Sequence, residues 1–255
     1  MPLDVVTIPC LSDNYAFLLH DSDTGRTALV DAPEAAPIIK ELDGKGWHLD
    51  EIWITHHHDD HILGVAELRE RYNAIVLGGA SDKGRLPALD REVGDGDAFE
   101  FAGHEVIVLD VSGHTIGHIA FYVAEAKTAF TADSLMALGC GRVFEGTFVQ
   151  MWDSLSKLAA LPADTVICSG HEYTAANGKF AVTIEPDNPD LISRVQSITA
   201  ARSNGQPTVP SLLSEELATN PFLRAKNPEV KALLGMETAS DAEVFAEIRR
   251  RKDSF

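Results

Sequence analysis

The sequence lacks the features that mark membrane-embedded and disulfide-bonded proteins. No hydrophobic run approaches the ~18 residues that a membrane helix needs, and Met1-Pro2-Leu3-Asp4 shows no cationic region ahead of an apolar core. The only cysteines, Cys10, Cys140 and Cys168, have neither paired nor CxxC spacing, which argues against a disulfide framework and a Cys-ligated zinc. We therefore expect a cytoplasmic protein with no membrane partner and with buried, structural thiols.

Basic residues are also scarce. The chain has 21 Lys and Arg against 39 Asp and Glu, a formal net charge of −18 at pH 7. Such a surface repels phosphate backbones, so nucleic acid is not an expected partner and a nuclease activity is disfavoured. The hydrophobic content of 45% is ordinary for a soluble globular protein. The length allows one large domain, or a medium domain with a smaller one.

Hydrophobic periodicity divides the chain into an α/β part and a helical part. Up to about residue 170, strands are predicted at 5–8, 16–19, 27–31, 51–55, 74–77, 99–101, 105–111, 119–123, 128–131 and 165–168, and helices at 37–42, 62–72 and 152–161. Further helices are predicted at 191–202, 212–218 and 228–234, and from the capping box at 240–243 to about 252. We predict domains at 1–172 and 173–255.

A dense group of metal-ligand side chains follows the apolar run Ile52-Trp53-Ile54. The stretch Thr55-His56-His57-His58-Asp59-Asp60-His61 places four candidate ligands within six residues: His56, His58, Asp60 and His61. Imidazole and carboxylate at this density suit zinc, iron or manganese. A solvated polar loop is the alternative interpretation, and His57 is expected to support the site rather than to bind metal.

Three more strands end in small-residue loops that present one His or Asp each: His114, Asp133 and His171. If the strand ends meet at one sheet edge, five His and two Asp suit two metals, with Asp133 as the bridge because a carboxylate has two oxygens. Taken singly, His114 could be a satisfied core histidine and Asp133 a turn or N-cap residue. His118 is a candidate for supporting a ligand.

These motifs resemble the metallo-β-lactamase superfamily, whose signature T-H-x-H-x-D-H matches Thr55 to His61. Within it the chain resembles the glyoxalase II, or hydroxyacylglutathione hydrolase, family along its whole length. The resemblance is carried by six further stretches: 12–15 (SDNY), 113–118 (GHTIGH), 139–147 (GCGRVFEGT), 170–174 (GHEYT), 219–224 (TNPFLR) and 249–253 (RRRKD). It implies an α+β fold, a four-layered αββα sandwich with a smaller C-terminal α-helical domain.

The resemblance also implies a ligand set and a substrate site. The first metal would be held by His56, His58 and His114, and the second by Asp60, His61 and His171, with Asp133 bridging. Residues implied at the glutathione end of the site are Arg142, Phe144, His171, Tyr173, Arg249 and Lys252. Arg142 stands where the family often has Lys, and Phe144, where it often has Tyr, lacks a hydroxyl.

The expected reaction is hydrolysis of an S-acyl glutathione, above all S-lactoylglutathione, by a hydroxide that bridges two divalent metals, zinc first and iron or manganese as alternatives. Asp60 is a candidate catalytic residue that would orient this hydroxide. Arg249 and Lys252 lie three apart on one helix face and could bind the carboxylates of glutathione. Their alternative role is that of basic residues favoured at a helix C-terminus.

The hydrolase is expected to be a monomer. Three other interpretations of the sequence remain open. The nearest is a persulfide dioxygenase of the same superfamily, with a single iron held by two His and one carboxylate. A nuclease is disfavoured by the acidic balance, and a non-catalytic binding protein is disfavoured because every expected ligand is present. Metal stoichiometry and oxygen consumption distinguish the dioxygenase from the hydrolase.

Overall fold

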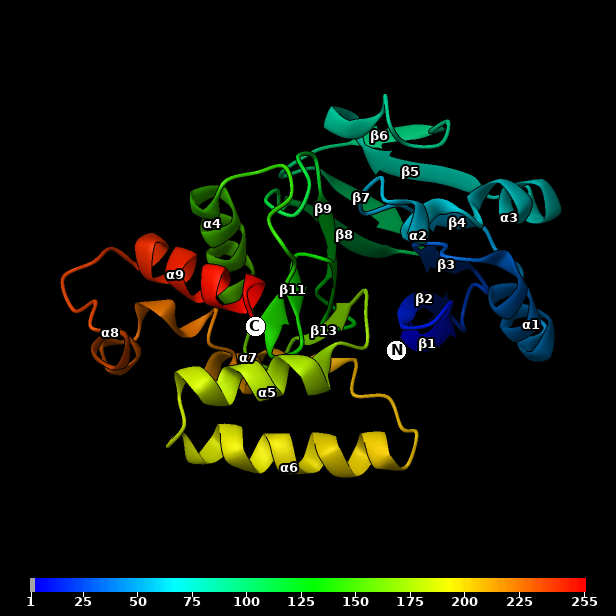
Figure 1. The fold of residues 1–255 in the computed structure, drawn as a ribbon. Helices are drawn as coiled ribbons and strands as arrows, with labels where there is room; N and C mark the ends of the chain where they lie inside the picture. The colour runs from blue at the N-terminus through cyan, green and yellow to red at the C-terminus, as the bar shows by residue number, and fades with distance from the viewer. Residues whose placement is uncertain (1–2) are drawn as a thin grey trace. The chain divides into compact units, whose positions relative to one another are not determined.

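The computed structural model describes residues 3–255, and its helices and strands are labelled in Figure 1. The chain divides into two compact units. The first contains the residues up to Asp110 together with Ile116–Ala132, and the second contains Val111–Thr115 and Asp133–Phe255. The predicted boundary near residue 172 is not a boundary of these units, and it stays a prediction.

A six-stranded sheet forms the N-terminal part of the first unit. Its strands lie in chain order: β1 Leu3–Cys10, β2 Asn14–Asp21, β3 Thr27–Val30, β4 Glu51–Trp53, β5 Ile75–Gly79 and β6 Arg91–Val93. The pairs β1–β2 and β2–β3 are antiparallel, whereas β3, β4, β5 and β6 run parallel. Parallel strands end at the same edge of a sheet, which is where α/β proteins place ligands. Asp31 after β3 and residues 55–61 after β4 leave the sheet at this edge.

Four antiparallel strands form the second sheet layer of this unit: β7 Ala98–Phe101, β8 His104–Asp110, β9 Ile119–Val123 and β10 Thr128–Ala132. The indole of Trp53 on β4 packs perpendicular to Phe99 and Phe101 on β7, with ring centroids 5.2 and 5.4 Å away. The two layers of the first unit therefore share an aromatic core, in the edge-to-face geometry that aromatic rings prefer.

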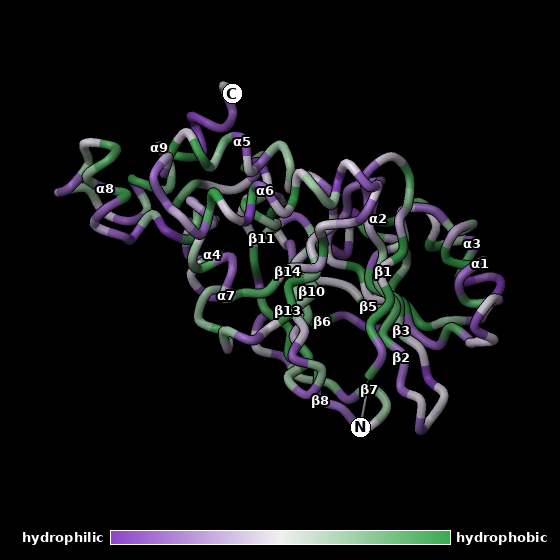
Figure 2. The backbone as a smooth tube through the Cα atoms, turned by 90° about the horizontal axis from the view of Figure 1, so that it is seen from below, coloured by the Kyte–Doolittle hydropathy of each residue, from purple (hydrophilic) through white to green (hydrophobic). Residues whose placement is uncertain are grey.

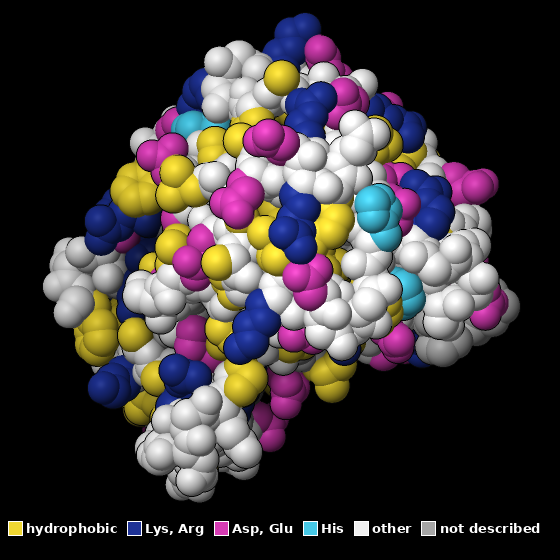
Figure 3. All heavy atoms as spheres, turned by 90° about the vertical axis from the view of Figure 1, so that its right-hand side faces the viewer, with side chains coloured by type: hydrophobic (Ala, Val, Ile, Leu, Met, Phe, Trp, Pro, Cys, Tyr) yellow, Lys and Arg dark blue, Asp and Glu magenta, His cyan; other side chains and the backbone are white. Residues whose placement is uncertain are grey.

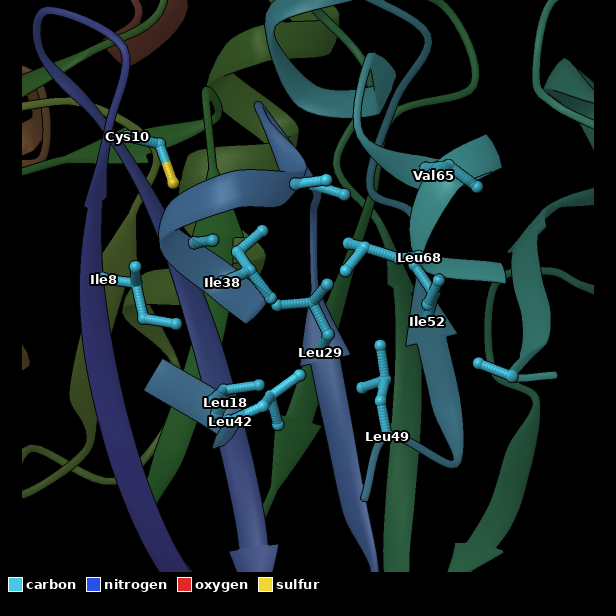
Figure 4. Packing of buried hydrophobic residues seen from close by; sticks show 14 of the residues in the cluster. Ile8, Cys10, Leu18, Leu29, Ile38, Leu42, Leu49, Ile52, Val65 and Leu68 are labelled. Atoms are coloured by element: carbon cyan, nitrogen blue, oxygen red, sulfur yellow. The ribbon is translucent and has the colours of Figure 1, made fainter. Parts of the chain in front are cut away.

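Helices cover the other face of the six-stranded sheet: α1 Ala35–Lys45, α2 Asp59–Ile62 and α3 Val65–Tyr72. Ile38 and Leu42, one turn apart on α1, are fully buried and lie against Leu18 and Leu29 of the sheet (Figure 4). Helix α1 ends at Gly46, whose φ of 67° is the left-handed conformation that favours glycine. The helix predicted at 37–42 is therefore confirmed, and it is longer than predicted at both ends.

Replacing Leu29 by alanine is expected to lower the free energy of unfolding by about 2–5 kcal/mol, because it opens a cavity in this packed cluster. Urea unfolding followed by circular dichroism measures the change. The matched control is Ile75→Ala on β5, whose side chain is 43% exposed and should cost below about 1 kcal/mol. Equal losses in the two variants would contradict the placement of the core.

The second unit contains six α-helices and four short strands among the described residues. The helices are α4 Phe148–Ala159, α5 Thr174–Ile184, α6 Pro189–Ser203, α7 Leu213–Thr219, α8 Pro228–Leu234 and α9 Asp241–Asp253. The strands are β11 Leu135–Met136, β12 Gly139–Cys140, β13 Val166–Ser169 and β14 Ser211–Leu212, with β11 paired to β12 and β13 to β14. Helices α5 and α6 lie side by side (Figure 1), and α4 packs against α9 through Phe148, Trp152 and Phe245. Figure 2 shows hydrophilic residues gathered at the end of α9 near the C-terminus.

Several predicted elements differ from the structure. The helix predicted at 62–72 begins only at Val65, as α3, and the separate short helix α2 precedes it, because the chain passes very close to another segment at Gly64. A Cβ on Gly64 would lie 2.8 Å from the Ala35 nitrogen, and the Gly64 N–H donates to the Ala32 carbonyl. Helix α4 begins at Phe148, four residues before the prediction, because Thr147 and Gln150 form a capping box there. Helix α5 and the short strands β6, β11, β12 and β14 were not predicted.

Charged side chains at the surface, the apolar character of the helices and the burial of the cysteines can each be compared with what the composition predicts. On the face drawn in Figure 3, Lys and Arg side chains are interspersed with Asp and Glu side chains. Across residues 3–255, no helix combines the length and the apolar character required to span a bilayer. All three cysteines are buried, as predicted. Burial raises the pKa of the Cys10 thiol to about 12 and of the Cys140 thiol to about 11, and it raises the pKa of Cys168 as well.

Candidate metal centre and substrate-binding residues

In the first unit, one carboxylate organises the predicted ligand loop. Asp31 follows β3 and accepts three hydrogen bonds. Its Oδ1 accepts from the Thr55 N–H at 2.9 Å, and its Oδ2 accepts from the Thr55 hydroxyl at 2.8 Å. The Nδ1 of His61 lies 2.8 Å from the same Oδ2. A carboxylate can only accept, so His61 carries its proton on Nδ1 and presents Nε2 to the site.

Asp31 also sets the tautomer of His56, through Thr55. The Thr55 hydroxyl hydrogen is used in the bond to Asp31, so Thr55 Oγ1 acts as an acceptor toward His56 Nδ1, 3.0 Å away. His56 therefore holds its proton on Nδ1 and offers Nε2, which lies 3.2 Å from His58 Nδ1. Both His56 and His61 are fully buried. An imidazole oriented in this way by a carboxylate is typical of a metal ligand.

Asp60 is held by Asn14, which belongs to the stretch 12–15. The amide of Asn14 donates to Asp60 Oδ2 at 2.9 Å and to the Asp60 carbonyl at 3.0 Å. The same Oδ2 lies 3.8 Å from His61 Nε2. The four predicted ligands His56, His58, Asp60 and His61 are therefore close together within the first unit. Asn14 was found by its motif, but its contact with Asp60 was not predicted.

Two more histidines flank this loop. His57 Nδ1 lies 3.1 Å from Asp82 Oδ2, which agrees with the supporting role predicted for it. His118 is fully buried, and its ring stacks on that of His56 with centroids 4.5 Å apart and an interplanar angle of 12°. This stacking restricts the orientation of the His56 ring, so His118 supports a candidate ligand.

In the second unit, Asp133 lies between the other two predicted histidines. Its Oδ2 is 3.4 Å from His114 Nε2 and 3.3 Å from His171 Nε2, and all three side chains are buried. The Nδ1 of His114 is 2.8 Å from the Arg142 carbonyl oxygen. A carbonyl only accepts, so this ring also carries its proton on Nδ1 and turns Nε2 toward Asp133.

Close backbone approaches produce this arrangement. Gly141 lies against the ligands: a Cβ there would be 2.0 Å from the Asp133 carbonyl oxygen and 3.0 Å from His114 Nδ1. At Gly113 a Cβ would meet Met151 of α4 at 2.6 Å, and its φ of 150° is unusual for other residues. Glycine is therefore required beside His114 and Asp133.

The donor chemistry of these residues fits divalent metal ions. When neutral, the imidazoles of His56, His61 and His114 each present an unprotonated Nε2 to the site. For His114 this acceptor faces a carboxylate oxygen, an arrangement that a cation between the two atoms would stabilise. Neutral imidazole and carboxylate are ligands of zinc, iron and manganese. The residues present therefore suit a metal centre.

Two of the residues implied at the glutathione end of the site, Phe144 and Tyr173, contact His114 and His171 in the second unit. Phe144 is 61% exposed, and its ring meets that of His114 edge-on at 5.3 Å. Tyr173 is 41% exposed and stacks on His171, with centroids 4.7 Å apart and an interplanar angle of 6°. These two aromatic side chains form exposed surfaces directly beside candidate metal ligands.

The basic residues of this region share one acidic partner, Asp253. Arg142 Nε lies 3.3 Å from Asp253 Oδ1, and Arg249 Nη2 lies 3.0 Å from the same oxygen. Arg142 is exposed, whereas Arg249 is 5% exposed and donates from Nη1 to the Cys140 carbonyl at 3.0 Å. Lys252 is partly buried, and burial, with Arg249 nearby, lowers the pKa of Lys252. Contact of these residues with glutathione stays a prediction.

The fold and the side-chain clusters match a known class of metalloproteins. The family model described as "Metallo-beta-lactamase superfamily" matches residues 12–171. Two solved structures share the fold. ETHE1 from Myxococcus xanthus has a TM-score of 0.67 at 23% identity, with 100% of both chains covered. The BLEG-1 B3 metallo-beta-lactamase has a TM-score of 0.66 at 18% identity, covering 86% of this chain and 99% of that one. The predicted α+β metallo-β-lactamase fold is thereby confirmed.

The C-terminal part narrows this class further. The family model "Hydroxyacylglutathione hydrolase C-terminus" matches residues 172–255. The proteins named hydroxyacylglutathione hydrolase from Roseobacter denitrificans and Ruegeria pomeroyi are 65% and 63% identical to this chain, over 100% of both chains in each case. This chain belongs to the hydroxyacylglutathione hydrolase family.

Proposed function

We propose that this protein hydrolyses S-acyl glutathione thioesters, in particular S-lactoylglutathione, to a hydroxy acid and free glutathione. In the cell this reaction would serve the detoxification of methylglyoxal. The observation that carries the proposal is the full-length identity of 65% to a protein named hydroxyacylglutathione hydrolase. A matched C-terminal model over residues 172–255 extends this support to the region that carries Tyr173, Arg249 and Lys252.

The proposed metal centre uses both groups of candidate ligands. His56, His58 and His114 would hold one divalent ion, Asp60, His61 and His171 a second, and Asp133 would bridge them. When bound, such ions supply a Lewis acid and lower the pKa of a coordinated water toward neutrality. We propose zinc, with iron and manganese as alternatives that the same ligand types accept.

The protein's own residues would orient the reacting groups. Asp31 fixes the tautomers of His56 and His61, so both rings keep Nε2 available as a ligand atom. Asp60, held by Asn14, would orient the attacking oxygen. A thiolate is a good leaving group, so no strong general acid is required, and the thiolate can take its proton from water after it departs. Preorganised groups of this kind lower a barrier because they need no rearrangement during the reaction.

The glutathione moiety would be bound by two aromatic residues beside His114 and His171, which are Phe144 and Tyr173, and by the basic residues Arg142, Arg249 and Lys252. Glutathione has two carboxylates, and cations on an otherwise acidic protein can select it. Since Phe144 has no hydroxyl, it would contribute packing only. We propose a cytoplasmic monomer that acts on a small-molecule thioester, without a nucleic acid or membrane partner.

The direct test follows thioester loss from S-lactoylglutathione with the purified, metal-loaded protein. We expect hydrolysis that is lost after thorough chelation and restored by zinc, with two metals bound per chain. The rival persulfide dioxygenase would instead consume oxygen with a glutathione persulfide and bind a single iron. That second result, or a fully metal-loaded protein without thioesterase activity, would refute the proposal.

Replacing Arg142 and Lys252 together by alanine is expected to lower kcat/KM for S-lactoylglutathione by about 10- to 100-fold, because charge-assisted bonds to the substrate carboxylates are lost. The loss for a small neutral thioester should be much less. The matched control is Arg251→Ala on α9, the helix that carries Lys252. The Arg251 side chain pairs with Glu247 at 2.9 Å. Equal losses on both substrates would show that these cations do not recognise glutathione.

A further inference from the structure

The short hairpin β11–β12 connects Asp133 to Arg142 and is buried almost completely. Leu135, Met136, Ala137, Leu138 and Cys140 are each at most 5% exposed. At the tip, Leu138 has a φ of 54°, a left-handed conformation that is uncommon for leucine. Only two strand residues pair on each side, so most backbone polar groups of this hairpin need partners from elsewhere in the chain.

Side chains from the C-terminal helical region supply these partners. The amide of Asn220 donates to the carbonyls of Met136 at 3.1 Å and Gly139 at 2.9 Å. Glu216 Oε2 accepts from the Leu138 N–H at 2.8 Å. The remaining contacts come from Asn177 to the Ala137 carbonyl, 3.1 Å, and from Arg249 to the Cys140 carbonyl, 3.0 Å. Five consecutive hairpin residues are thus held by side chains that lie 40 or more positions away in the sequence.

Glu216 and Asn220 form one connected group. Both are fully buried, and Asn220 Nδ2 also donates to Glu216 Oε2 at 3.1 Å. The other oxygen of Glu216 accepts from the Ser211 hydroxyl at 2.6 Å and from the Arg194 guanidinium. A buried carboxylate with this many donors is fixed in position, because loss of any partner would leave a buried charge undercompensated.

The hairpin also has little space in which to shift. A Cβ on Gly139 would lie 2.4 Å from Asn177 Nδ2, and a Cβ on Gly141 would lie 2.0 Å from the Asp133 carbonyl oxygen. The backbone is therefore in contact with side chains on one side and with the candidate ligand on the other. A displacement of the hairpin would be transmitted to Asp133 and Arg142, which lie two residues before β11 and two residues after β12.

We infer that Asn220 and Glu216 are positioning residues that hold the β11–β12 hairpin and thereby place Asp133 and Arg142 for the reaction. The effect of these two residues on the reaction rests on the proposed function. Their hold on the β11–β12 hairpin, in contrast, can be measured without any activity assay. Misplacement of reacting groups by about 1 Å can cost ~100-fold in rate. Helices α6 to α9 would thus influence the metal centre although none of them supplies a metal ligand.

The test compares Asn220→Ala with Asn188→Ala. Asn188 also donates to a backbone carbonyl, that of Ala218, and accepts from two backbone N–H groups, but none of its bonds reaches the hairpin. In the metal-loaded full-length protein, Asn220→Ala should speed amide hydrogen exchange in the peptide covering 135–140 about tenfold or more. It should lower kcat/KM for S-lactoylglutathione by about tenfold or more. Asn188→Ala should change both by less than about twofold when measured at the same temperature below its melting point.

Graded variants keep the inference testable if Asn220→Ala does not fold. Asn177→Ala removes one hairpin bond and should give a smaller change of the same kind. Glu216→Gln keeps an acceptor for the Leu138 N–H, so it should protect that amide better than Glu216→Ala. Parent-like exchange and kinetics in the folded Asn220 or Asn177 variant, or equal changes in Asn188→Ala, would overturn the inference. A parent protein without thioesterase activity would refute the proposed function, while hydrogen exchange would still decide whether the hairpin is clamped.

Discussion

Replacing Asp133 by alanine is expected to abolish nearly all thioesterase activity, with a fall in kcat of about 1,000-fold or more, equivalent to about 4 kcal/mol in the barrier. Asp133 Oδ2 lies within 3.4 Å of both His114 and His171. Its removal would take away the proposed bridge and leave two imidazoles without their shared carboxylate. Metal content, measured by mass spectrometry of the purified protein, should fall below two ions per chain.

Asp133→Asn distinguishes charge from shape at this position. The amide keeps the size of the side chain but has one oxygen and no negative charge, so it should bind metal more weakly and leave activity well below that of the parent. The control is Asp153→Ala, which removes an exposed carboxylate from α4 in the same unit and should leave kcat unchanged. Full activity and two metals in Asp133→Ala would show that the proposed centre is wrong.

Replacing Asp31 by asparagine is expected to weaken metal binding by about 10- to 100-fold, although Asp31 is not a proposed ligand. Its carboxylate accepts from Thr55 N–H, from the Thr55 hydroxyl and from His61 Nδ1. An amide has one acceptor oxygen, so its NH₂ group would face one of these donors. The tautomers of His56 and His61 would then no longer be fixed. Competition with a chelator of known affinity measures the change.

Asparagine is the informative substitution because Asp31 has a φ of 57°, a left-handed conformation that asparagine tolerates. Alanine at this position would add backbone strain and confuse folding with metal binding. Asp21→Asn is the matched control: Asp21 is also buried in the first unit and accepts from Thr24, away from the ligand loop. If Asp31→Asn bound metal as tightly as Asp21→Asn does in the chelator competition, the role of Asp31 would be contradicted.

Local sequence signals were sufficient for many elements. Strand β9 and helix α8 have the predicted bounds, 119–123 and 228–234, because an apolar run and a Pro-to-Gly pattern define their ends locally. The capping box at 240–243 correctly located the start of α9. Helix α5 was missed because it follows directly from the candidate ligand His171 and has only a weak amphipathic pattern. The two-residue strands are defined by their partners and leave almost no local pattern.

The candidate ligands show the same contrast. The spacing of His56, His58, Asp60 and His61 within one loop could be recognised from the sequence, because neighbours in a loop stay close in any fold. Asp31 was taken only as the end of a strand. Its bond to His61 spans 30 residues. Only the expectation that strand ends meet at one sheet edge could have indicated this contact from the sequence. Similarly, Arg249 was identified as a cation but not as a buried one.

The sequence by itself determined the chemistry available to this protein: the types and local spacing of the metal-binding side chains, the acidic balance, and the resemblance to one enzyme family. The tertiary structure decided which nitrogen His56, His61 and His114 present, because Asp31, Thr55 and the Arg142 carbonyl fix those tautomers through contacts made only on folding. It also decided how the segment between Asp133 and Arg142 is held, since the side chains that bind this segment are 40 or more residues away along the chain. Local pattern specifies what a residue can do, whereas long-range hydrogen bonding selects what it does.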